Sequence, residues 1–132
     1  MMTREQRVLV VDDDREMRGV VAGTLRREGY TVIEASDGVE ALDVAARMLP
    51  DLVLVDITLP GMDGVEVTRQ LKARPTLAAV PVVALTALTQ GVVRDRALAA
   101  GCSHYLTKPC PPAALRDVVA QTLAATRASR GS

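Results

Sequence analysis

The amino-acid sequence predicts an α/β protein with an open, doubly wound sheet of five parallel strands. Short apolar runs occur five times along the chain, and helix-like segments separate them. Regular alternation of strand and helix with short connections favours a parallel sheet covered by helices on both faces. Five strands are too few to close a TIM barrel, so the sheet is expected to be open. The runs lie at 7–11, 31–34, 51–55, 81–85 and 103–107.

Helical periodicity is clearest in two segments, one after the first run and one after the last. Both have the spacing of a helix with one buried face. The segments near 37–48 and 63–72 open with an aspartate followed three residues later by a glutamate, a variant of the capping box. The Ala-rich segment near 90–100 has a less regular apolar stripe. The ordered core is expected over 7–123, and residues 124–132 are expected to form a frayed tail. The residues of the two clear stripes are Met17, Val20, Val21, Thr24, Leu25 and Leu115, Val118, Val119, Thr122, Leu123.

The composition indicates one domain over residues 1–132 and argues against several classes of protein. No linker or low-complexity segment divides the chain. With 16 basic and 16 acidic residues, the formal net charge is zero, which gives no electrostatic support for binding nucleic acid or an anionic membrane. The apolar runs are too short to span a bilayer, and the first residues do not lead into a signal-peptide core. We therefore expect a cytoplasmic protein.

Polar side chains follow four of the predicted strands at the point where each strand ends. Asp12 and Asp13 follow the first run, Asp56 the third, Thr86 the fourth and Lys108 the fifth. In an open parallel sheet, ligands bind outside the carboxyl ends of the strands, where the strand order reverses. A strand order of 2-1-3-4-5 would place the first and third strands side by side. The three aspartates would then converge at that point.

Three neighbouring carboxylates either raise a pKa or bind a cation, because two unit charges ~4 Å apart repel by about 4 kcal/mol at an effective dielectric near 20. Oxygen ligands favour a hard cation, and Mg²⁺ fits best because it needs only one or two carboxylates. With one His and no Cys-x-x-Cys motif, a site built on Cys and His is not expected. One of these carboxylates can also attack phosphorus to give an aspartyl phosphate. Lys108 and Thr86 are candidates to contact the phosphoryl oxygens.

Taken together, these motifs resemble the receiver domain of two-component response regulators. Each motif is weak alone, whereas the whole set in this order and spacing is highly specific. The resemblance implies a flavodoxin-like fold and a signalling role, as in the single-domain chemotaxis receiver. It covers residues 7 to about 123. It rests on Val10-Val11-Asp12-Asp13, Asp56 with Pro60-Gly61 and Asp63-Gly64, Thr86-Ala87, Tyr105 and Lys108-Pro109.

The resemblance implies that Asp56 accepts a phosphoryl group from a histidine kinase or a phosphotransfer protein. It implies Mg²⁺ bound by Asp13, Asp56 and the backbone carbonyl of Thr58, with Asp12 assisting through water and Lys108 contacting the phosphate. Such a domain is not an enzyme for a separate substrate. It catalyses only its own Mg²⁺-dependent phosphorylation and dephosphorylation, and it passes the signal to a downstream target protein.

The resemblance also implies how the signal leaves the site. Thr86 and Tyr105 would form a switch pair, in which the hydroxyl of Thr86 moves to the phosphoryl group and Tyr105 rotates inward. This change would remodel the face formed by the helix near 90–100, the fifth strand and the last helix. A further implication is a cis peptide bond between Lys108 and Pro109, although only about 5–6% of X-Pro bonds in folded proteins are cis.

Two features depart from the pattern of the family. Thr58 and Leu88 occupy the variable positions two residues past Asp56 and Thr86, which tune autodephosphorylation. An apolar Leu88 cannot orient an attacking water, which favours slow hydrolysis of the acyl phosphate. Cys110 stands where a large apolar residue is common, so the packing beneath that loop is expected to differ.

Two other functions stay open at this point. One is a pseudo-receiver scaffold that is not phosphorylated, although such domains usually lose the acids or the lysine present here. The other is an aspartyl-phosphate phosphatase of the haloacid-dehalogenase type. That family needs a second acid two residues after its nucleophile, where this chain has Thr58.

Overall fold

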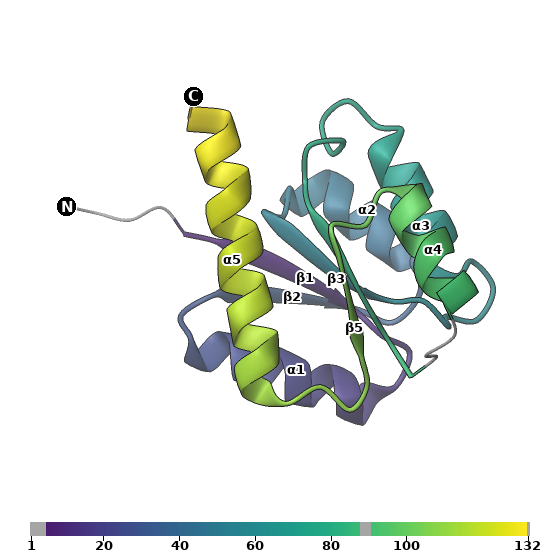
Figure 1. The fold of residues 1–132 in the computed structure, drawn as a ribbon, viewed down its shortest axis with the longest axis horizontal. Helices are drawn as coiled ribbons and strands as arrows, with labels where there is room; N and C mark the ends of the chain where they lie inside the picture. The colour runs from purple at the N-terminus through teal and green to yellow at the C-terminus, as the bar shows by residue number, and fades with distance from the viewer. Residues whose placement is uncertain (1–4, 88–90, 132) are drawn as a thin grey trace.

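Five parallel strands form the centre of the molecule, in the order β2-β1-β3-β4-β5 (Figure 1). The structure, a computed structural model, describes residues 5–87 and 91–131. The predicted fold class and strand order are confirmed, and the arrangement is flavodoxin-like. Each predicted run becomes a strand with bounds shifted by no more than one residue. The strands are β1 (Arg7–Val11), β2 (Thr31–Ala35), β3 (Leu52–Asp56), β4 (Val82–Thr86) and β5 (His104–Thr107).

Five helices alternate with the strands, and their starts follow the capping signals in the sequence. The side chains of Asp14, Asp37 and Asp63 accept hydrogen bonds from backbone N–H groups in the first turns of α1, α2 and α3. At the start of α2, Glu40 also accepts from the N–H of Ser36 at 2.7 Å, one residue before the Asp37 N-cap, which gives a variant of the capping box. The helices are α1 (Arg15–Arg27), α2 (Gly38–Met48), α3 (Gly64–Lys72), α4 (Gly91–Ala100) and α5 (Pro112–Gly131).

The sheet separates two apolar cores. Alternate residues of each strand point to opposite faces, so one face packs against α1 and α5 and the other against α2, α3 and α4. The central strands β1, β3 and β4 are almost entirely buried, which explains their continuous apolar runs. Within the described part of the chain, no helix has both the length and the apolar character needed to cross a membrane.

The C-terminal segment differs from its prediction. Helix α5 continues to Gly131, so the residues expected to form a frayed tail are helical over most of their length. Alanine and arginine are strong helix formers, and Ala124, Ala125, Arg127 and Ala128 are largely exposed. The sequence analysis considered the small polar character of this segment and overlooked its high helix propensity.

Candidate functional site

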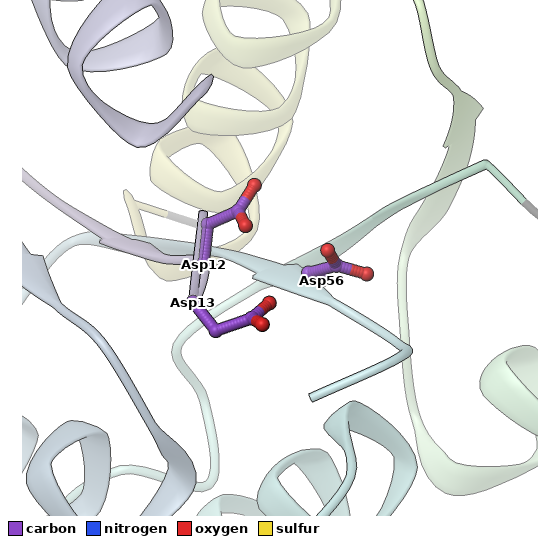
Figure 2. A group of neighbouring side chains, drawn as sticks. All are labelled: Asp12, Asp13 and Asp56. Atoms are coloured by element: carbon purple, nitrogen blue, oxygen red, sulfur yellow. The ribbon is translucent and has the colours of Figure 1, made fainter. Parts of the chain in front are cut away.

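Two neighbouring strands bring the three predicted aspartates together. Asp12 and Asp13 follow β1, Asp56 ends β3, and these two strands are paired in the sheet. One carboxylate oxygen from each residue lies within 4.8 Å of the other two. Figure 2 shows the side chain of Asp13 extending toward that of Asp56. Asp12 and Asp56 are buried while Asp13 is exposed, so the cluster lies at the protein surface with one open side.

Lys108 ties the two buried aspartates to each other. Its Nζ donates to Oδ2 of Asp12 at 2.7 Å and to Oδ2 of Asp56 at 2.8 Å. Burial of the side chain alone would lower the pKa of Lys108, but the hydrogen bonds and charges of Asp12 and Asp56 outweigh it and raise the pKa. The lysine is therefore a fixed positive charge at neutral pH. The geometry places it beside Asp56, as the sequence analysis expected.

The other oxygen of Asp56 is held by the residue two positions later. The backbone N–H and the hydroxyl of Thr58 both donate to Oδ1 of Asp56 at 2.9 Å. The backbone behind the carboxylate is crowded, since a Cβ on Gly64 would lie 2.4 Å from the carbonyl oxygen of Asp56. Asp56 is thus fixed by its own loop and by the start of α3. The sequence analysis assigned Thr58 a backbone carbonyl and did not anticipate its hydroxyl contact.

Asp12 is held at each of its polar groups. Its N–H donates to the carbonyl of Ala35 at 3.1 Å, and its Oδ1 accepts from the N–H of Asp14 at 2.9 Å. Its backbone carbonyl accepts from Nη1 of Arg18 at 2.8 Å. The sequence analysis gave Arg18 no role, because six residues of separation and a polar helix position carry no signal of this contact.

Thr86 and Tyr105 lie on the same face of the sheet, on the neighbouring strands β4 and β5. Thr86 is fully buried at the end of β4, and Tyr105 packs against the core shared by α2, α3 and α4. Tyr105 is paired with Ala84, two residues before Thr86, so the two side chains are diagonal neighbours on that face. Burial raises the pKa of Tyr105, and the nearby charge of Arg94 opposes this.

The loop after β5 bears on two expectations, one for the Lys108–Pro109 bond and one for Cys110. The Lys108–Pro109 peptide bond is cis, which confirms the prediction. Cys110 is partly exposed and lies beside Met17, Val20 and other residues around a small apolar pocket between α1 and the start of α5. Leu88, the basis for predicting slow hydrolysis, lies outside the described residues.

The acidic cluster has the donor set of a metal site. The group consists of three carboxylates, which supply only oxygen ligands. Cys102 is buried in the core with its thiol against Thr68. Hard cations such as Mg²⁺ or Ca²⁺ prefer oxygen ligands, whereas zinc sites favour Cys and His. Asp12, Asp13 and Asp56 are therefore suited to hold a hard divalent cation.

Comparison with known proteins identifies the family. The model of the response regulator receiver domain matches residues 8–120. The chain belongs to this family. Of the solved structures, a putative response regulator from Chloroflexus aurantiacus superposes with a TM-score of 0.88 at 33% identity, covering 92% of this chain and 99% of that one. The chemotaxis protein CheY4 of Vibrio cholerae gives a TM-score of 0.86 at 30% identity, covering 90% and 99%.

Curated relatives of this receiver are longer than the chain itself. It is 40% identical over 127 residues to the DNA-binding response regulator MtrA of Mycobacterium tuberculosis, covering 96% of this chain and 53% of MtrA. It is 47% identical over 103 residues to the response regulator PleD of Caulobacter vibrioides, covering 78% of this chain and 23% of PleD. The chain therefore spans about half the length of MtrA and less of PleD.

Proposed function

We propose that this receiver is activated by phosphorylation of Asp56, with a histidine kinase or a phosphotransfer protein as the donor. One observation carries the proposal. Nζ of Lys108 bridges Asp12 and Asp56 at 2.7 and 2.8 Å, beside a third carboxylate at the carboxyl ends of β1 and β3. A nucleophilic carboxylate, a fixed cation and a set of oxygen ligands are the parts that phosphoryl transfer to aspartate requires.

The cation we propose is Mg²⁺, held by Asp13, Asp56 and the backbone carbonyl of Thr58, with Asp12 acting through water. When bound, such an ion neutralises charge on the oxygens of the transferring phosphoryl group. The exposure of Asp13 supports this choice, because Mg²⁺ keeps several waters and needs few protein ligands. Without a bound cation, the cluster carries three carboxylates, of which Lys108 contacts two, and negative charge is in excess at the site.

Asp56 is the nucleophile in this proposal. A carboxylate oxygen of Asp56 attacks phosphorus, an acyl phosphate bond forms, and the bond from phosphorus to the donor imidazole nitrogen breaks. The leaving imidazole keeps the electron pair and takes up a proton. Lys108 exchanges one of its carboxylate contacts for a phosphoryl oxygen, and the hydroxyl of Thr86 donates to another. The chain thus catalyses only its own phosphorylation and, with water as the nucleophile, its own dephosphorylation.

The signal then passes along the face that holds Thr86 and Tyr105. Phosphorylation adds about −1.5 to −2 charges at Asp56. If the hydroxyl of Thr86 moves toward the phosphoryl group, the Thr86 side chain leaves a space beside β4. Tyr105, its diagonal neighbour on β5, is positioned to fill that space. Both arrangements must already be populated, since a ligand only shifts an existing equilibrium. The remodelled surface of α4, β5 and α5 is where a target would dock.

The partner at that surface is, in this proposal, a protein. The balanced charge of the chain, 16 basic against 16 acidic residues, gives no support for direct contact with nucleic acid. MtrA is named as a DNA-binding regulator, but this chain matches only about half of it, so that activity is not transferred here. We place the exchange with the kinase in the cytoplasm, where two-component receivers usually act.

The alternative is a pseudo-receiver scaffold, and one experiment separates the two. Intact-mass spectrometry follows the protein incubated with acetyl phosphate, with and without Mg²⁺. A receiver gains one phosphoryl group, only with Mg²⁺, and loses it to hydroxylamine as an acyl phosphate does. The matched control is Asp56→Asn, which keeps the side-chain shape and should gain nothing. Unmodified wild-type protein would favour the scaffold, and phosphorylation of Asp56→Asn at the wild-type rate would refute the site.

A further inference from the structure

Arg18, the fourth residue of α1, connects the acidic loop that holds Asp12 and Asp13 to strand β2. Its Nη1 donates to the backbone carbonyl of Asp12 at 2.8 Å, and its Nε donates to Oε1 of Glu34 on β2 at 3.1 Å. Only 16% of the Arg18 side chain is exposed. Glu34 is itself held from the other side by Arg26, whose Nη2 lies 3.2 Å from Oε2. A planar guanidinium can make both contacts at once because its donors form a rigid fork.

The carbonyl of Asp12 accepts from Arg18 at the place where the sheet stops supplying donors. The pairing of β1 with β2 ends at Val11 and Ala35, and the N–H of Asp12 makes the last backbone bond of this edge. The next residue that could continue this ladder to the carbonyl of Asp12 is Asp37, and there the chain has already turned away to form the N-cap of α2. A buried backbone carbonyl needs a hydrogen-bond donor. At Asp12, which is 3% exposed, a side chain supplies it.

The position of Asp12 determines where the next carboxylate goes. Each polar group of Asp12 has a partner from a different part of the fold: β2 at its N–H, α1 at its carbonyl, its own loop at Oδ1 and Lys108 at Oδ2. Asp13 is exposed, so packing does little to fix it, and its place depends on the backbone that it shares with Asp12. Arg18 thereby acts on two of the three carboxylates.

We propose that Arg18 is a positioning residue for the divalent cation site, acting through the backbone of Asp12 without touching the ion. The inference rests on the proposed function in one respect, namely that the cluster binds Mg²⁺. Partners that orient metal ligands typically contribute a factor of 10–100 to metal affinity. Arg18 orients a ligand loop by one contact, so the lower end of that range, about 10-fold, is expected.

Charge alone predicts the opposite sign, which makes the test decisive. A guanidinium bonded to the backbone of Asp12 is a positive charge near the cation site, so its removal should tighten Mg²⁺ binding if electrostatics were its only effect. If Arg18 positions the loop, its removal should weaken binding despite the loss of that repulsion. The direction of the change therefore distinguishes the two roles.

The experiment is a titration of the whole chain with MgCl₂, followed by amide chemical shifts of Asp13 and Asp14. The first variant is Arg18→Met, which keeps the length of the stem and removes both contacts. The second is Arg18→Lys, which keeps the charge but cannot form the fork. The matched control is Arg26→Met, which removes the other ion pair of Glu34 and does not touch Asp12. Chemical-shift dispersion reports whether each variant is folded.

The expected result is a Kd for Mg²⁺ about 10-fold weaker in Arg18→Met, an intermediate loss in Arg18→Lys and a Kd within 2-fold of wild type in Arg26→Met. An unchanged or tighter Kd in folded Arg18→Met would overturn the inference, as would an equal loss in Arg26→Met. If Arg18→Met does not fold, Arg18→Lys decides by the same criterion of weakened against unchanged binding. A wild-type chain that binds no Mg²⁺ would instead refute the proposed metal site itself.

Discussion

Helices α1 and α4 flank the same sheet but are held to it very differently. Along its 13 residues, α1 buries Val21, Ala22, Thr24 and Leu25 and is linked to β2 by the ion pairs of Glu34. Along its 10 residues, α4 buries only Ala97. Two large apolar residues of α4, Val92 and Leu98, are 62% and 43% exposed. Helix α1 is anchored by four buried residues, whereas α4 contacts the core through buried Ala97 and the partly buried Val93 and Ala100.

The contrast between α1 and α4 parallels the roles proposed for the two regions, phosphoryl transfer beside α1 and signal output beside α4. Helix α1 begins directly after the acidic loop, so the proposed chemistry takes place beside a helix with a broad buried face. Helix α4 follows β4 and packs near Tyr105, so it belongs to the part that is proposed to change. Segments with few buried contacts open at low free-energy cost, which suits an element that must move. The region proposed to carry the signal therefore includes the helix with fewer buried residues.

The difference between α1 and α4 predicts that replacing a leucine by alanine destabilises the protein much more in α1 than in α4. This is the largest effect that we expect. Leu25 of α1 is fully buried, so Leu25→Ala should lower the free energy of unfolding by about 2–5 kcal/mol. Leu98 of α4 is 43% exposed, and Leu98→Ala should change it by less than about 0.5 kcal/mol. Urea unfolding followed by circular dichroism measures both. Equal losses in the two variants would remove the basis of the comparison.

A second test uses two glycines, one in the crowded site and one on the open side of α1. A Cβ on Gly64 would lie 2.4 Å from the carbonyl oxygen of Asp56 and 2.8 Å from Cα of Ile57, so Gly64→Ala should cost about 1–3 kcal/mol and slow phosphorylation. Nothing lies within 4 Å of a Cβ on Gly19, so Gly19→Ala should gain about 0.5–1 kcal/mol. A tolerated Gly64→Ala with normal phosphorylation would show that the close packing behind Asp56 is dispensable.

A third test separates chemistry from signalling. Thr86→Ala leaves the three carboxylates and Lys108 in place, so the variant should still accept a phosphoryl group. It should lose most of the amide chemical-shift change in α4 and β5 on addition of beryllofluoride, which stands in for the phosphoryl group. The chain has no Trp, so NMR is preferable to fluorescence. Wild-type shifts around Tyr105 in the activated variant would contradict the switch proposal.

The smallest effect concerns the two lysines, whose pKa values shift in opposite directions. The pKa of Lys108 is raised because its contacts with Asp12 and Asp56 outweigh its burial, while burial lowers the pKa of Lys72. Stability from Lys108 is present below its unfolded pKa of about 10.4 and is lost as pH rises through the folded pKa. For Lys72, stability increases with pH between its folded and unfolded pKa values.

Unfolding of Lys108→Met and Lys72→Met across alkaline pH tests these signs. The stability difference between wild type and Lys108→Met should shrink above pH of about 10.4. For Lys72, the free energy of unfolding of wild type relative to Lys72→Met should increase as the pH rises toward about 10.4. The same direction of change for both lysines would mean that the carboxylates do not stabilise the charge of Lys108.

The sequence predicted the sheet well because its signals are local. Apolar runs define buried strands, and aspartates at the ends of β1 and β3 converge once the strand order is known. The contact of Arg18 with Asp12 was missed, since it depends on where the β1–β2 ladder ends and on the angle at which α1 leaves the loop. The helical end of α5 was missed because small polar composition was given more weight than the helix propensity of alanine and arginine.

The central claim is that Asp56, among three clustered aspartates, carries the phosphoryl group. The most direct measurement is reduction of the phosphorylated chain with borohydride, which converts an aspartyl phosphate to homoserine, followed by peptide mass spectrometry. We expect homoserine at residue 56 alone, dependent on Mg²⁺ and absent without a phosphodonor. Homoserine at residue 12 or 13, or none in a chain that had gained a phosphoryl group, would contradict it.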